Sequence, residues 1–215
     1  MVSHDLKAPL RGIHNLINWI QDDLEGASGE TSEHLKLLQA QGDRMISMID
    51  AILNYSKVTS GPLKMEKVNV QELLNEIFDE LAIPSEFIIK FSTQLPVLIS
   101  YRTKLKQVFS NLISNAVKYH NRPNGLIEIS ANEKDEEFEF VIKDDGPGID
   151  PKYHKRIFEI FKTIEADSKK KSSGVGLAIV EKIIKDFRGT IDVESDVGKG
   201  ASFKFMHPKI KSEIS

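Results

Sequence analysis

"NLISNAVKY" (residues 111–119) lies within an apolar pattern that predicts a long helix over residues 103–120. Asn111, Asn115 and Lys118 stand at positions i, i+4 and i+7 and therefore share one face of this helix. Their neighbours are apolar, so the two amides are expected beside a hydrophobic core, where an unpaired amide is costly. We expect a polar group to satisfy them; a solvated helix face is the alternative if no other motif agrees.

The segments around this helix alternate between helical and extended patterns. Phe138, Phe140 and Ile142 alternate with more polar neighbours, as in a half-buried strand. We expect an α/β sandwich over residues 63–210, with helices on one face of a mostly antiparallel sheet. The further helices are expected at 71–81 and 176–187, and the strands at 65–70, 87–92, 96–100, 126–131, 137–143, 190–194 and 201–206.

Residues 1–58 carry a different pattern. Apolar residues recur at alternating spacings of four and three from Leu6 to Leu24, and a second stripe runs from Leu35 to Leu53. These stripes predict an antiparallel helical hairpin, followed by a linker at 59–62. One partner helix covers each stripe incompletely, so we expect two hairpins to form a dimeric four-helix bundle, which makes the protein a homodimer.

Composition excludes several classes of function. The chain of 215 residues has a net charge of −3, so no global basic field draws in nucleic acid. It contains no cysteine, which rules out disulfides and thiolate metal sites and is compatible with a reducing cytoplasm. No apolar run is long enough to span a bilayer, so we expect no membrane segment in this fragment, although a parent protein could carry one.

"VIKDDGPGID" (residues 141–150) ends a predicted strand with two aspartates and two glycines. A carboxylate such as that of Asp144 could accept the exocyclic amine of a purine. Gly146 and Gly148 would let the backbone approach a ligand closely. Taken alone, the motif fits a plain turn about equally well.

"SSGVGLAIV" (residues 172–180) places Gly174 and Gly176 at the start of a predicted helix. Free backbone N–H groups and the positive end of the helix dipole suit an anion such as phosphate. The motif lacks the third glycine of a dinucleotide fingerprint, and the chain contains no Walker-type P-loop. The lysine-containing segment 162–173 that precedes it has the composition of a mobile flap.

Six motifs, in order, resemble the H, N, G1, F, G2 and G3 boxes of the sensor histidine kinases of two-component signalling. They are "SHDLKAPL", "NLISNAVKY", "DDGPGI", "RIFEIF", "SSGVGLAIV" and "GKGASF", and together they cover nearly the whole chain. The resemblance implies a dimerisation and histidine-phosphotransfer hairpin over residues 1–58. It also implies a Bergerat-type ATP-binding domain over residues 63–210.

The resemblance implies a role for each motif. His4 would be the phosphoacceptor, with Asp5 as the base that frees an imidazole nitrogen. ATP and Mg²⁺ would be the cofactors, with Asn115 as the metal ligand. The implied ATP-binding set comprises phosphate contacts, an adenine wall, the purine-binding aspartate and the hinge of a flap: Asn111, Asn115, Lys118, Tyr119, Asp144, Gly146, Gly148, Phe158, Phe161, Lys162, Gly174, Val175, Gly176, Leu177 and Ser202. Within this set, Ser202 is expected to hold Asp144 or the adenine.

The implied function is ATP-dependent autophosphorylation of His4, followed by transfer to an aspartate of a response regulator receiver domain. We expect a cytoplasmic protein. Ala8 stands where many family members carry Thr or Asn, so we expect weak or absent dephosphorylation of the regulator. Only three residues precede His4, so Met1 and Val2 are expected to mark a truncation that leaves His4 on a frayed first helical turn.

Two alternative functions fit the sequence less well than a histidine kinase. An ATP hydrolase on the same fold would need a glutamate where Asn111 stands, and an amide cannot take a proton from water. A catalytically weak dimeric scaffold that only binds nucleotide and a regulator would be expected to lack a phosphoacceptor or metal ligand, and both His4 and Asn115 are present. The remaining histidines are expected to have surface or packing roles: His14, His34, His120, His154 and His207.

Overall fold

A computed structural model describes most of the predicted α/β domain and portions of the predicted hairpin. The residues that it describes are 12, 13, 16, 17, 19, 20, 31, 33–42, 45, 46, 49, 64–160, 162 and 174–209. All of the described residues before 64 are helical, in agreement with the predicted hairpin. His4, Asp5 and Phe161 lie outside the described residues, so their predicted roles rest on sequence alone. In the described part of the chain, no helix is long and apolar enough to cross a membrane.

The second part of the chain is built on a five-stranded sheet in the order β2-β4-β5-β7-β6. Its strands are β2 (Ile88–Phe91), β4 (Leu126–Glu133), β5 (Glu137–Asp144), β7 (Ala201–Pro208) and β6 (Ile191–Ser195). The β2–β4 pair is parallel, and the other pairs are antiparallel. A separate two-stranded antiparallel sheet pairs β1 (Glu66–Asn69) with β3 (Val97–Ser100).

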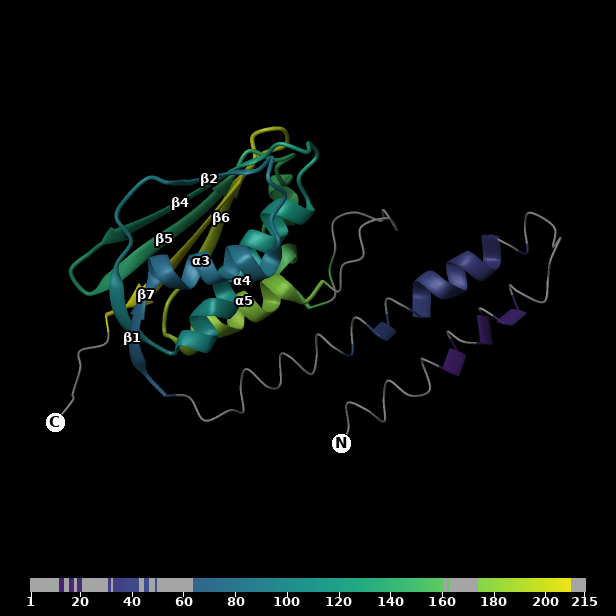
Figure 1. The fold of residues 1–215 in the computed structure, drawn as a ribbon, viewed down its shortest axis with the longest axis horizontal. Coiled ribbons are helices and arrows are strands. Elements are labelled where there is room, and N and C mark those ends of the chain that lie inside the picture. The colour runs from purple at the N-terminus through teal and green to yellow at the C-terminus, as the bar shows by residue number, and fades with distance from the viewer. Residues whose placement is uncertain are drawn as a thin grey trace.

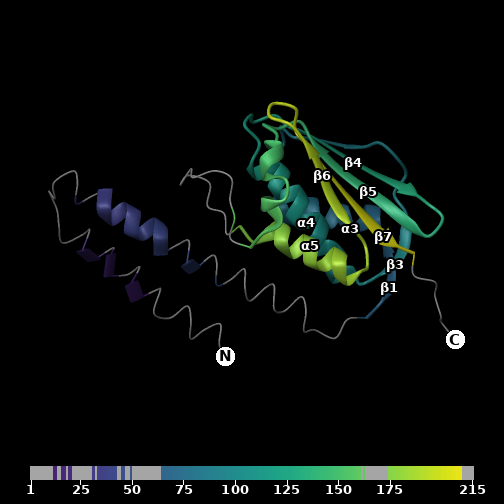
Figure 2. The same ribbon diagram turned by 180° about the vertical axis from the view of Figure 1, so that it is seen from behind.

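The helices cover one face of the five-stranded sheet, as Figures 1 and 2 show from opposite sides. They are α3 (Val70–Leu81), α4 (Arg102–Lys118) and α5 (Gly176–Asp186), with two short 3₁₀ turns, η1 (Pro151–Tyr153) and η2 (Arg156–Phe158). Asn69 begins α3 as its N-cap, because its side-chain oxygen accepts the amide hydrogens of Gln71 and Glu72. The predicted α/β sandwich is confirmed.

The core lies between the helices and the sheet, and it is centred on three aromatic rings. Phe109 of α4 meets Phe140 of β5 and Phe205 of β7 edge to face, with ring centroids 5.5 Å apart in each pair. Phe140 and Phe205, which are register partners on neighbouring strands, stack at 5.1 Å. All three rings are fully buried. This contact fixes α4 against the two strands whose ends carry the site described below.

Two features of the fold are absent from the sequence prediction. The expected strands near 65–70 and 96–100 exist, but β1 and β3 pair with each other instead of joining the large sheet. In addition, β2 is parallel to β4, because the chain crosses over through β3 and α4 between them. Strand propensity identifies strands but carries no information about distant pairing partners.

The aromatic centre should dominate the stability of this domain. Phe140→Ala removes a fully buried ring, so we expect it to lower the free energy of unfolding by about 3–5 kcal/mol, as measured by urea denaturation. The adjacent Val141 lies on the outer face of the same strand and is only half-buried. Val141→Ala should therefore cost much less, and equal losses from the two changes would contradict this account of the core.

Candidate functional site

Asp144, the last residue of β5, holds a partly buried carboxylate. Its Oδ1 accepts hydrogen bonds from the backbone N–H groups of Gly146 at 2.9 Å and of Ala201 at 3.3 Å. Burial raises the pKa of Asp144, and these two amides only partly offset that rise. Among the described residues, no hydrogen bond reaches the second oxygen, Oδ2. One carboxylate oxygen is therefore fixed by the protein and the other can accept from a ligand.

Glycine is required at two positions around this carboxylate. Gly148 has φ +72°, and a β-carbon there would lie 1.9 Å from the carbonyl oxygen of Asp196. Gly200 has φ +73°, and a β-carbon there would lie 2.0 Å from the carbonyl oxygen of Asp144 itself. The loop after β5 and the β6–β7 turn thus pack backbone against backbone. Any side chain at either glycine would push these two segments apart.

The next residue, Asp145, is held by the connection between α4 and β4. Its Oδ1 accepts from the Leu126 amide at 2.7 Å and lies 3.0 Å from His120 Nε2, while Arg122 donates to Oδ2 at 2.6 Å. Burial would raise the pKa of Asp145, but these three contacts together lower it. The two consecutive aspartates therefore differ in role: Asp144 has one oxygen without a protein donor among the described residues, and both oxygens of Asp145 have protein donors.

The amide face of α4 lies beside the start of α5. Asn111, Asn115 and Lys118 are each half-buried on the helix. The side-chain nitrogen of Asn111 is buried without a hydrogen-bond partner among the described residues, and its oxygen lies 3.4 Å from where a β-carbon of Gly176 would be. Burial lowers the pKa of Lys118. An unpaired donor next to a helix N-terminus fits an anionic ligand that supplies the missing acceptor.

The other predicted site residues fall into three groups. Tyr119 directly follows α4, and its N–H bonds to the carbonyl of Asn115. Phe158 and Val175 contribute side chains to the core: Phe158 packs edge to face against Phe203, and Val175 is 1% exposed just before α5. The remaining three lie at or near the ends of the undescribed stretch before α5: Lys162, which is exposed, and Gly174 and Leu177, which are half-buried.

The prediction that Ser202 holds Asp144 is wrong. The contact comes from the backbone N–H of the preceding residue, Ala201. Ser202 pairs with Lys143 and Glu194 in the strand register, and strand side chains alternate between the two faces. Its side chain therefore points away from the helices and from Asp144.

His120 is a residue whose contacts the sequence did not indicate. It was expected to have a surface or packing role, yet its side chain is buried and lies within hydrogen-bond distance of Asp145 Oδ1. A lone histidine outside any ligand-spaced cluster gives no sequence signal for a contact that spans 25 positions.

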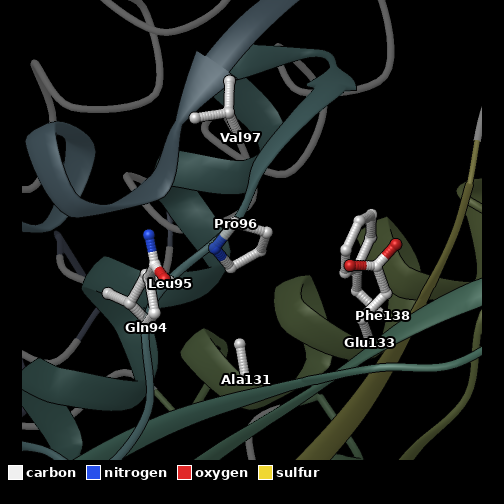
Figure 3. Close-up of a pocket in the computed structure, with 7 residues that line it drawn as sticks. All are labelled: Gln94, Leu95, Pro96, Val97, Ala131, Glu133 and Phe138. Carbon is white, nitrogen blue, oxygen red and sulfur yellow. The ribbon is translucent and has the colours of Figure 1, made fainter.

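A cavity of about 360 Å³ lies elsewhere in the domain (Figure 3). It is lined by the segment before β3, the end of β4 and the start of β5, so it lies at the opposite end of β5 from Asp144. None of the predicted site residues lines it. Its lining residues are Gln94, Leu95, Pro96, Val97, Ala131, Glu133 and Phe138.

The two aspartates should affect stability in opposite directions as the pH changes. The folded state raises the pKa of Asp144, so stability is lost as the pH rises from 3.8, the ordinary pKa, through the folded pKa. Asp144→Asn should therefore raise Tm near pH 7, with the difference vanishing in acid. The folded state lowers the pKa of Asp145, so its stabilisation is present above 3.8 and is lost as the pH falls through the folded pKa.

Asp145→Asn should accordingly lower Tm near pH 7, and it serves as the matched control for Asp144→Asn. Scanning calorimetry of both variants across pH measures the two effects. A loss of stability in Asp144→Asn at neutral pH would show that the buried charge of Asp144 is fully compensated by its contacts.

Comparisons with known proteins agree with this geometry. Residues 1–61 match the model of the His Kinase A (phospho-acceptor) domain, and residues 100–211 match that of the histidine kinase-, DNA gyrase B- and HSP90-like ATPases. Cyanobacterial phytochrome B of Nostoc sp. is 36% identical over 95% of this chain, which spans 28% of that relative's length.

Solved structures show the same likeness. A crystal structure of full-length ShkA in complex with AMPPNP matches 98% of this chain and 45% of its own length, with a TM-score of 0.69 and 26% identity. The histidine kinase AdeS of Acinetobacter baumannii shares the fold, with a TM-score of 0.65 and 19% identity over 97% of this chain and 98% of its own. The chain therefore belongs to the histidine kinase family, and it contains that family's phosphoacceptor and ATP-binding regions.

Proposed function

We propose that this chain is a kinase core that uses ATP to phosphorylate its own His4 and then passes the phosphoryl group to an aspartate of a response regulator receiver domain. The observation that carries the proposal is the geometry of the Asp144 carboxylate, whose Oδ1 is fixed by two backbone amides while Oδ2 can accept from a ligand; burial also raises its pKa. Groups kept in such states are concentrated at functional sites. The relatives found above support the same class of activity.

Asp144 would select the adenine of ATP. Its oxygen Oδ1 is occupied by the Gly146 and Ala201 amides, which leaves Oδ2 to accept from the exocyclic amine. A purine that carries a carbonyl in place of the exocyclic amine would place its oxygen, a second acceptor, against Oδ2. Tyr119, which follows the amide face of α4, would form part of the adenine wall.

The phosphates would lie between α4 and α5. The unpaired Asn111 nitrogen can donate to a phosphate oxygen, and Gly174 and Gly176 let the first backbone amides of α5 approach it. Lys118 adds positive charge. Asn115 would offer its amide oxygen to Mg²⁺, an ion that favours a few protein oxygens together with phosphate and water. When bound, Mg²⁺ neutralises phosphate charge and fixes the orientation of the transferring group.

The chemistry itself would fall to His4 and Asp5. The neutral imidazole of His4 would attack the γ-phosphorus with one ring nitrogen, while Asp5 accepts the proton of the other. A nitrogen–phosphorus bond forms, and the bond between the phosphorus and the oxygen that leaves with ADP breaks. In the second step, the nitrogen–phosphorus bond breaks as a phosphorus–oxygen bond to the regulator's carboxylate forms, and Asp5 returns its proton so that the ring leaves as neutral imidazole.

The hairpin would form the dimer interface. Several of its described helical residues are large, apolar and exposed, and a single hairpin has no further helix to cover them. A second copy of the same hairpin would complete a four-helix bundle. We place the assembly in the cytoplasm, where ATP and a receiver domain are available. The exposed residues are Ile13, Leu16, Trp19, Ile20, Leu37, Leu38 and Met45.

His4→Gln tests the phosphoacceptor. We expect this variant to gain no acid-labile, base-stable label from γ-labelled ATP and Mg²⁺, because an amide cannot form the phosphoramidate. Its affinity for ADP, measured by calorimetry, should equal that of the wild type. Normal labelling of the variant would refute the assignment of His4.

Asn115→Ala tests the metal ligand. Loss of the amide oxygen should raise the Mg²⁺ concentration needed for half-maximal labelling by about tenfold or more. Asn132→Ala is the matched control, because Asn132 is an exposed asparagine at the far end of β4. Among the described residues, its side chain bonds only to the side chain of Glu139. An unchanged Mg²⁺ dependence in Asn115→Ala would assign the metal to other ligands.

A further inference from the structure

We propose that His120 is a positioning residue for adenine recognition, which acts by fixing the segment Asp144–Gly146. The inference rests on the proposed function, because it assumes that Asp144 receives the purine amine. His120 itself touches no reacting atom. It lies two residues beyond α4, which carries the amide face of the site. It bonds to Asp145, which directly follows the proposed purine-binding residue Asp144.

The ring of His120 is held on several sides. Its side chain is 1% exposed and meets the edge of Phe87, with centroids 5.3 Å apart. Its Nδ1 lies 2.9 Å from the carbonyl oxygen of Arg122 and 3.1 Å from the amide of the same residue. Its Nε2 lies 3.0 Å from Asp145 Oδ1. These contacts restrict the orientation of the ring, and the ring in turn orients the Asp145 carboxylate through the contact with Nε2.

Both ring nitrogens of His120 have partners that fit a hydrogen-bonded ring. In the neutral ring, Nε2–H donates to Asp145 while Nδ1 accepts the Arg122 amide hydrogen. The Arg122 carbonyl oxygen also lies within hydrogen-bond distance of Nδ1.

The ring also packs against Gly146, whose N–H donates to Asp144. A β-carbon on Gly146 would be 3.3 Å from His120 Cδ2 and 2.8 Å from Asp144 Oδ1. Gly146 is thus packed between the histidine ring and the carboxylate that accepts its N–H. Without the ring, the Gly146 peptide loses a packing contact, and Oδ1 loses one of the two amides that orient it and keeps only Ala201.

The test compares ADP with inosine diphosphate, which has a carbonyl in place of the exocyclic amine. In wild type, contact with Asp144 should make ADP the tighter ligand by calorimetry. His120→Ala and His120→Phe both remove the donor to Asp145, and the second keeps an aromatic ring. We expect each to weaken ADP binding about five- to twentyfold, which lies near the low end of the effect of one direct hydrogen bond to a charged group, and to reduce the preference for ADP by a similar factor.

His120→Gln provides the rescue, because its side-chain amide can still donate to Asp145, and it should retain most of the preference for ADP. His207→Ala is the matched control: His207 is also buried, bonds to Ser100 at 2.9 Å and pairs with Phe138 at the far end of β5. It should lower Tm and leave the preference unchanged, as any purely structural histidine would.

Two results would overturn the inference, and they are distinguishable. If Asp144→Asn abolishes the preference for ADP while the His120 variants keep it, His120 has no positioning role and the proposed function stands. If Asp144→Asn itself keeps the preference, the purine contact is wrongly assigned, and the inference fails together with the adenine-recognition part of the proposed function.

Discussion

The partly buried Asp144 carboxylate sets the geometry around it. A carboxylate removed from water needs hydrogen bonds to remain charged, and here both come from backbone amides. The Ala201 amide reaches Asp144 only because Gly200 adopts a left-handed conformation against the end of β5. The loop that contains Gly146 turns back through Gly148, where the Asp196 carbonyl leaves no room for a side chain. Close backbone packing around this carboxylate thus explains why positions 148 and 200 are glycine.

The sheet makes this arrangement possible because β5 is its central strand. Its neighbours β4 and β7 both begin where β5 ends. The first amide of β7, from Ala201, binds Asp144, and the first amide of β4, from Leu126, binds Asp145. Two consecutive aspartates can therefore be held by different strands. One is left with an available oxygen, and the other ties the α4–β4 connection to the same loop.

Much of the fold follows from local pattern, whereas the errors concern information that side-chain pattern lacks. Apolar periodicity located α4 and β5 closely, because burial on one face imposes it directly. The pairing of β1 with β3 depends on distant partners. Ser202 was expected to hold Asp144 because its hydroxyl can donate a hydrogen bond. The donor is instead a backbone amide, which every residue except proline possesses, so no side chain marks it in the sequence. The contact of His120 with Asp145 is likewise a product of the fold.

The chemistry of the α4 face explains why this domain would transfer phosphate to an imidazole and not to water. The face presents two amides and one ammonium group, and α4 contains no aspartate or glutamate along its whole length. Water attack on a phosphate needs a nearby group that accepts its proton, and an amide cannot do so. A neutral imidazole needs no such help at the attacking nitrogen, because its lone pair is already available. The domain would therefore hold the nucleotide without hydrolysing it, and turnover would require a nucleophile from the hairpin.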